Sequence, residues 1–182
     1  MGNYYYTVAA LPTIFFGEKA PISEEEFLQF AEDTLKPEHF QIISKSRLSS
    51  VEPTGSVFAD RILSWEKELR LELAEARMAK LKFSPSEPLP RSDGQDALHE
   101  QVKAIMAMDS PLEAERFMDQ LRWAFLEDME ASHFFDLETI IIYFFKLQIA
   151  LRQEKFQKEP GQQAFSETHE SITQGYEKIM RG

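Results

Sequence analysis

Apolar residues recur along the chain at intervals of three and four positions, which is the spacing of an amphipathic α-helix. The pattern predicts short helices after Ser23 and Pro37, and then helices over about 57–83, 95–108, 111–129, 136–158 and 165–179. Tyr4–Val8 is rich in strand-forming residues, but a single strand would leave its backbone unpaired, so we expect a helix there as well. The sequence therefore predicts an all-α, multi-helix bundle.

Several helix ends are marked by residues that satisfy free backbone groups. Ser23 with Glu26 forms a capping box, and Ser110 with Glu113 forms a second one around Pro111. Asp136 is a further expected cap. Three prolines near 84–94 cannot continue a helix, so we expect one domain over 1–182 whose two helical halves are separated by a Pro-rich linker.

The long helix over about 57–83 carries two opposite apolar stripes. The first stripe consists of Phe58, Ile62, Trp65, Leu69, Leu73 and Ala76, and the second consists of Leu71, Ala74, Met78 and Leu81. Acidic side chains, including Glu68 and Glu72, occupy one flank, where they face either solvent or a basic neighbour. A helix with two apolar faces must be covered on both sides, and we expect an internal layer rather than a partner to do this.

The helix after Pro111 has a different pattern. Its expected buried stripe consists of Ala114, Phe117, Leu121, Ala124 and Phe125. Trp123 points away from that stripe, next to the charged Arg122. A large ring on a polar face marks either a protein interface or packing beneath a loop of the same chain. The predicted partner contacts are therefore Trp123, Arg122, Glu68 and Glu72.

Composition narrows the possible functions. Among 182 residues, 31 acidic and 20 basic side chains give a formal net charge of −11, which disfavours binding to nucleic acid. The absence of cysteine excludes disulfides and thiolate metal sites and is typical of a reducing compartment. The most apolar run, 140–145, is far shorter than the roughly 20 residues that span a bilayer. We expect a cytoplasmic protein without direct membrane insertion.

Motifs for catalysis are scarce. Glu130 and His133 have the Glu-x-x-His spacing of di-metal helical bundles, but such bundles need a second copy, which the sequence lacks. No glycine pattern forms a phosphate-binding loop or a nucleophile elbow. We therefore expect neither catalytic residues nor a cofactor or metal. The alternatives left open are a metal-binding hydrolase built on Glu130 and His133, and a general helical interaction module.

Three blocks of sequence carry a family resemblance. They begin at Asn3, at Trp65 and at Ser110, and the third continues through Leu121-Arg122-Trp123 and His133–Glu138 to Tyr143–Gln148. Together they resemble an uncharacterised bacterial family encoded with V-type ATPase genes, which is itself similar to the C-type rotor subunit of V/A-type ATPases (its eukaryotic counterpart is designated d). The resemblance extends from residue 3 to about 165, without the Pro-rich linker.

The resemblance implies a non-catalytic adaptor. The C-type subunit sits on the cytoplasmic end of the membrane rotor ring, receives the foot of the central shaft, and binds no nucleotide. The implied partners are therefore the central shaft and the rotor ring. True C-type subunits are longer and contain three related helical units, whereas this sequence shows no repeat. The expected protein is a reduced C-like subunit or an accessory protein of the complex.

Overall fold

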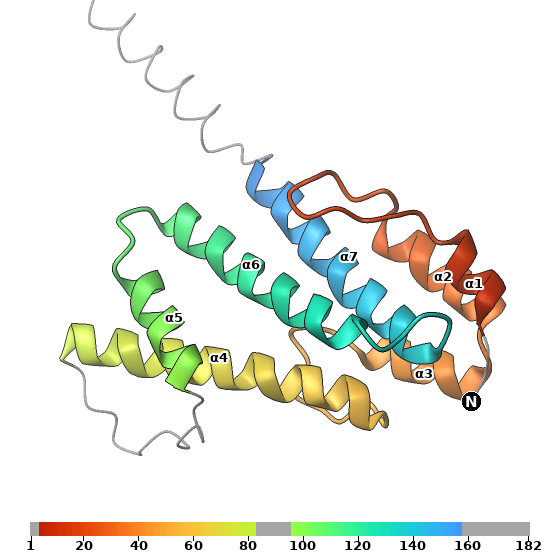
Figure 1. Ribbon diagram of the computed structural model, residues 1–182, viewed down its shortest axis with the longest axis horizontal. Helices are drawn as coiled ribbons and strands as arrows, with labels where there is room; N and C mark the ends of the chain where they lie inside the picture. Colours follow the sequence, from red (N-terminus) through yellow and green to blue (C-terminus); the bar gives the residue numbers. More distant parts are fainter. Residues whose placement is uncertain (1–3, 83–95, 158–182) are drawn as a thin grey trace, which may run out of the picture.

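The computed structural model describes residues 4–82 and 96–157. These residues form seven helices and no strand, so the predicted all-α class is confirmed (Figure 1). In chain order the helices are α1 (Tyr5–Ala10), α2 (Glu24–Thr34), α3 (Pro37–Lys45), α4 (Val57–Leu81), α5 (Asp96–Met106), α6 (Pro111–Glu130) and α7 (Leu137–Gln157). The Pro-rich linker and the helix predicted over 165–179 lie outside the described residues.

The predicted caps explain where the helices begin. Ser23 and Glu26 form the complete capping box of α2, with both hydrogen bonds present. The Ser110 hydroxyl accepts the backbone N–H of Glu113 at the start of α6. Asp136 accepts the backbone N–H of Thr139, at 3.0 Å, at the start of α7. Local sequence therefore sets these boundaries, because each side chain satisfies a backbone donor that the helix leaves free.

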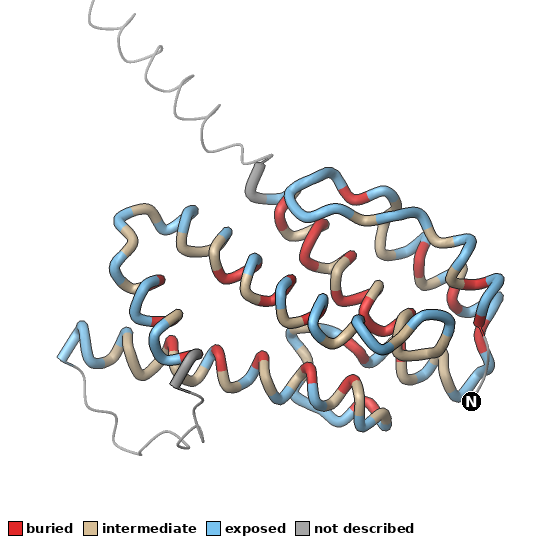
Figure 2. The backbone as a smooth tube through the Cα atoms, viewed as in Figure 1, coloured by how far each residue is buried: buried red, intermediate tan, exposed pale blue. Residues whose placement is uncertain are grey.

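Two hydrophobic clusters hold the helices together. The first surrounds the middle of α7, where Ile141, Phe144 and Phe145 are completely buried, and it includes side chains from α2, α3, α4 and α6. The second joins α4, α5 and α6 around Leu69 and Val102. Figure 2 shows the first cluster as the red, buried turns of α7, with exposed residues along the outer helices.

The two faces of α4 have different surroundings. On the predicted first stripe, Ile62, Leu69 and Leu73 are buried. On the second stripe, Leu71, Ala74 and Met78 are half-buried and Leu81 is 77% exposed. The expected internal layer over the second stripe is therefore wrong for the described part of the chain, because α5, α6 and α7 all pack toward the first stripe.

The buried face of α6 also differs from the prediction. Its buried residues are Met118, Asp119, Arg122, Trp123 and Leu126. The predicted stripe is half-buried, except for Ala124, which is exposed. The apolar pattern predicted the wrong buried face because α6 packs between α7 and the α4–α5 pair. The most buried face of α6 contains charged residues that pair with other helices. No helix in the described ranges is long and apolar enough to cross a membrane.

Candidate functional site

Arg122, one of the predicted partner contacts, lies at the centre of a buried ion network. Its guanidinium binds both carboxylate oxygens of Glu66 on α4, through Nε at 2.8 Å and Nη2 at 2.9 Å. Its Nη1 donates to Asp119 Oδ1, also at 2.8 Å. Arg122 is 5% exposed, Glu66 2% and Asp119 1%. Arg122 therefore joins α4 to α6 inside the chain and presents no free surface.

Further charges extend the network toward solvent. Arg70 donates from Nε to Glu66 Oε1 at 2.8 Å, and from Nη2 to the backbone carbonyl of Leu48 at 2.7 Å. On the other side, Arg152 of α7 lies 3.7 Å from Asp119 and also pairs with Glu115. The network therefore connects three helices through alternating charges.

Burial and pairing act in opposite directions on the charges of this network. Burial raises the pKa of Asp119 above its usual value, although Arg152 and Arg122 oppose that effect. Burial would lower the pKa of Arg122, but the Glu66 and Asp119 carboxylates outweigh it and raise that pKa. Arg122 therefore stays charged. Asp119 Oδ2 accepts no hydrogen bond within the described part of the chain.

Trp123 is packed beneath a loop of its own chain. It is 6% exposed, and its ring meets Phe16 from the loop between α1 and α2 at a centroid distance of 5.4 Å. The indole N–H donates to Glu127 at 2.9 Å, and the ammonium of Lys146 lies 5.1 Å from the ring centre. Of the two interpretations of Trp123, the structure supports packing within the chain.

The two acidic contacts predicted on α4 occupy more open positions. Glu72 lies 3.2 Å from Nδ1 of His99 on α5, and its side chain is 11% exposed. Glu68 is half-buried. Their contact with a partner stays a prediction.

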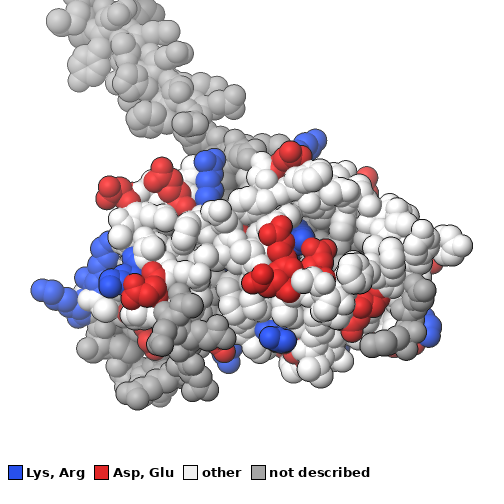
Figure 3. All heavy atoms as spheres, in the orientation of Figure 1, with Lys and Arg blue, Asp and Glu red and all other residues white. Residues whose placement is uncertain are grey.

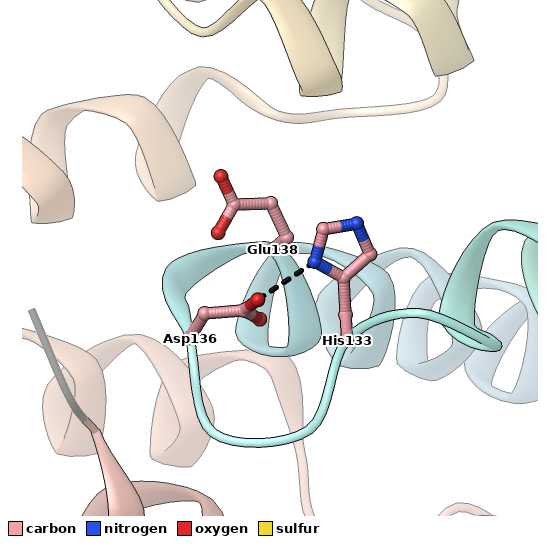
Figure 4. A group of neighbouring side chains, drawn as sticks. All are labelled: His133, Asp136 and Glu138. Atoms are coloured by element: carbon pink, nitrogen blue, oxygen red, sulfur yellow. Dashed lines mark hydrogen bonds and ion pairs between the residues drawn. The ribbon is translucent and has the colours of Figure 1, made fainter. Parts of the chain in front are cut away.

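The turn between α6 and α7 brings together His133, Asp136 and Glu138 (Figure 4). One potential ligand atom from each lies within 4.8 Å of the others. Glu130, which the sequence pairs with His133, instead binds Lys146 at 2.5 Å. The Glu-x-x-His motif therefore does not form a shared site, and Asp136 and Glu138 are candidates that its spacing did not indicate.

Capping accounts for the main contacts of this group. Asp136 Oδ2 is hydrogen-bonded to His133 Nδ1 at 2.7 Å, while Oδ1 accepts the amide and the hydroxyl of Thr139. Burial opposes ionisation of Asp136, but the hydrogen bonds from His133 and Thr139 outweigh it and lower the pKa of Asp136. Oδ1 thus stabilises the start of α7 and Oδ2 holds the His133 ring, so a metal ion bound through His133 Nδ1 would have to replace that hydrogen bond.

A cleft of about 420 Å³ lies between α4 and the loop that precedes it. Leu48, Pro53 and Leu63 contribute apolar lining, and Glu66 and Arg70 contribute charge. Because Glu66 accepts from two arginines and Arg70 donates to Glu66 and to Leu48, these charged groups are already paired. Glu66 and Arg70 are thus paired within the fold, and the cleft is also lined by the charged residues Glu52, Asp60 and Lys67.

Sequence reasoning missed Glu66. The position of Glu66 in the sequence could have revealed its burial, since Glu66 lies on the same side of the helix as the apolar residues Ile62 and Leu73. A lone acid within an apolar stripe needs a buried cation, and Arg122 provides it.

Part of the chain is similar to a known family. The model of a family described as "Protein of unknown function (DUF2764)" matches residues 97–176, which include α6 and α7. No curated protein and no solved structure matches the chain. Similarity over residues 97–176 to a family of unknown function is what these comparisons establish.

Proposed function

We propose that this chain is a non-catalytic, C-like subunit or accessory protein of a V/A-type ATPase, which joins the central shaft to the membrane rotor ring. The support from sequence is the three resembling blocks, whose described residues lie mainly on α1, α4, α6 and α7 and on the α6–α7 turn. The proposal includes a cytoplasmic location at the membrane, reached through the complex.

The observation that carries the proposal is the pairing of the buried charges. Glu66, Arg122 and Asp119 are buried together at hydrogen-bond distance and bridge helices. Catalytic groups usually lie in a cavity with an atom that is free to meet substrate, whereas Glu66, which borders the cleft beside α4, already accepts from Arg122 and Arg70. The paired charges connect α4 to α6, which suits a protein that works through the rigidity of its body and through broad surface contacts.

Affinity purification from the native cell tests the proposal. The full chain, carrying a tag, is recovered from membranes solubilised in mild detergent, and its partners are identified by mass spectrometry against an untagged strain. We expect subunits of the central shaft and of the rotor ring. Recovery of neither group from intact, folded protein would contradict the adaptor function.

Loss of the gene provides a functional readout. An adaptor transmits torque, so its removal uncouples hydrolysis from transport. We expect inverted membrane vesicles from the deletion strain to lose ATP-driven ion transport, while the catalytic head retains ATP hydrolysis. Unchanged ATP-driven transport in the deletion strain would count against the adaptor function. A loss of both transport and ATP hydrolysis that the cloned gene does not restore would also count against it.

One observation favours the metal-binding alternative. His133, Asp136 and Glu138 offer nitrogen and oxygen atoms close enough together to bind one divalent ion. Elemental analysis of the purified protein decides between the two functions. Stoichiometric metal that is lost in the His133→Ala variant would support a metal site and would count against a purely structural role for this turn.

A further inference from the structure

Four aromatic side chains are exposed where α1 meets the turn between α6 and α7. The exposed fractions are 87% for Tyr6, 69% for Phe134, 50% for Tyr5 and 44% for Phe135. We refer to these four residues as the aromatic patch. Figure 2 shows α1 and this turn as largely exposed at the same end of the molecule.

The aromatic patch is built onto fixed backbone. The Tyr4 amide donates to the Phe135 carbonyl at 2.7 Å, which ties the start of α1 to the turn. The Tyr5 ring lies 4.7 Å from the Phe135 ring and 5.5 Å from the Tyr6 ring. Behind the patch, the Tyr4 hydroxyl is hydrogen-bonded to His39 of α3 at 2.5 Å. The rings of Tyr5, Tyr6 and Phe135 are therefore held together by the fold, and Phe134 is the neighbouring residue in the same turn. This order lowers the entropic cost of binding a partner.

Exposed aromatic residues in a group differ from scattered apolar residues. Single exposed side chains, such as Val51 at 93%, are ordinary on a soluble protein. Rigid tyrosine and phenylalanine rings gathered on one surface are enriched in protein interfaces, because they bury a large area when a partner covers them.

The charges on one side of the aromatic patch are acidic. Residues 127–138 contain five acidic side chains and no lysine or arginine. The last turn of α6, whose carboxyl end carries a partial negative charge, also has no basic residue. Figure 3 shows Asp and Glu side chains gathered over the second half of α6. Lys146 of α7 already pairs with Glu130, and its side chain is 12% exposed.

The α1 side of the aromatic patch adds no charge of its own. Residues 4–17, which include α1, contain no acidic or basic side chain. A partner that covers both sides must therefore combine an apolar stripe with positive charge along one edge. Tyrosine and phenylalanine rings also attract such cations through their faces.

We propose that the aromatic patch binds an amphipathic helix of another protein, with an aliphatic stripe and a row of lysine or arginine along one edge. This inference rests on the adaptor function, because it assigns the surface by which an adaptor is held. A second copy of this chain fits poorly, since residues 4–17 and 127–138 contain no lysine or arginine to pair with the acidic side chains of the other copy. An anionic lipid surface is repelled by those residues.

A synthetic probe tests the chemistry. An 18-residue helical peptide of leucine and lysine, labelled with fluorescein, is titrated with the full chain and followed by fluorescence anisotropy. Its counterpart replaces each lysine with glutamate. We expect the glutamate peptide to bind at least tenfold more weakly. Equal binding of the two peptides would overturn the proposal.

Matched variants locate the binding surface. The first double variant, Tyr6→Ser with Phe134→Ser, removes the two most exposed rings of the aromatic patch. The control double variant, Val51→Ser with Leu81→Ser, removes exposed apolar side chains elsewhere. Both pairs should keep the melting temperature, because the replaced side chains are at least two-thirds exposed. We expect at least tenfold weaker binding for the first pair and unchanged binding for the second. Equal effects of the two pairs would place the binding surface elsewhere.

Cross-linking in the native cell distinguishes this proposal from the adaptor function. A photo-reactive phenylalanine analogue at position 6 is activated, and mass spectrometry identifies the cross-linked segment. A cross-link to a cationic amphipathic helix supports the inference, whether or not that helix belongs to an ATPase. Cross-links to lipid or to a second copy would overturn it. ATPase subunits that co-purify equally with the Tyr6→Ser and Phe134→Ser variant, together with no cross-link from position 6 to such a helix, would overturn it while leaving the adaptor function intact.

Discussion

Replacing Glu66 with leucine should destabilise this protein strongly. Glu66 is 2% exposed, and its two oxygens accept from Arg122 and Arg70. The Glu66→Leu variant leaves the Arg122 guanidinium buried with Asp119 as its remaining ion-pair partner. Breaking a buried ion pair from one side costs about 3–5 kcal/mol, because the charge that stays behind has lost both water and its partner.

The contribution of Arg70 is smaller. Its side chain is 47% exposed, so solvent screens its pairing with Glu66 and limits the loss to about 0–1 kcal/mol. The total of about 3–6 kcal/mol lowers the melting temperature by roughly 6–24 °C for a chain of this size. Glu68→Leu, on the same helix at a half-buried position, serves as the control and should change stability by less than about 1 kcal/mol.

Urea unfolding followed by circular dichroism at the helix band measures both variants. A triple variant with Glu66→Leu, Asp119→Leu and Arg122→Met tests the mechanism, because removing all three charges leaves no buried ion without a partner. We expect the triple variant to lie within about 2 kcal/mol of the wild type. The reasoning is refuted if Glu66→Leu lowers the free energy of unfolding no more than Glu68→Leu does. It is also refuted if the triple variant is as unstable as Glu66→Leu alone.

Three further predictions concern single side chains. Trp123→Ala should lower stability by about 3–5 kcal/mol, because the ring is buried against Phe16; retention of the wild-type urea midpoint would argue against that packing. Tyr143→Phe should raise stability by about 1 kcal/mol, since the buried Tyr143 hydroxyl lacks a hydrogen-bond partner in the described structure. The same burial raises the pKa of Tyr143 to about 12. A loss of stability on urea unfolding would indicate that the hydroxyl has a partner. The pKa of Asp136 is lowered, so its ionised form stabilises the fold above about pH 4, and this contribution is lost as the pH falls through the folded-state pKa. Asp136→Asn keeps a capping oxygen but should flatten the dependence of stability on pH below about pH 4. An unchanged slope would contradict the effect.

The helix boundaries could be predicted because they depend on neighbouring residues. Ser23, Ser110 and Asp136 satisfy backbone groups a few positions away, so the sequence contains both partners of each contact. The fold class follows from the apolar periodicity for the same reason. The buried face of α6 could not be predicted in this way, because Asp119 and Arg122 look like surface residues until helices from other parts of the chain enclose them.

The aromatic patch and the packing of Trp123 depend on contacts between distant segments. Tyr5 and Phe135 are separated by most of the chain and meet because the Tyr4 amide binds the α6–α7 turn. Phe16 reaches Trp123 from a loop whose sequence contains no periodic pattern. A large ring on a polar face was informative, but periodicity alone does not distinguish a loop of the same chain from a partner.

The ion network occupies the boundary between the two hydrophobic clusters. Along α4, Ile62 belongs to the first cluster and Leu69 to the second, with Glu66 between them. Along α6 the order is reversed: Met118 belongs to the second cluster and Leu126 to the first, with Arg122 between them. The two helices thus run antiparallel through both clusters, and the two hydrogen bonds from Arg122 to Glu66 fix their register at the crossing.

This register matters for the proposed adaptor function. Apolar side chains tolerate small sliding between helices, whereas a buried bidentate ion pair loses its geometry and exposes unpaired charge when the helices shift. A force applied at the aromatic patch reaches the first cluster through α1 and the α6–α7 turn. Under the proposed adaptor function, we expect the Glu66–Arg122 pair to resist sliding of α4 along α6, so that the force would reach the α5 end instead of being absorbed between the clusters. In the adaptor function that we propose, the buried charges would therefore keep α4 and α6 in register under load.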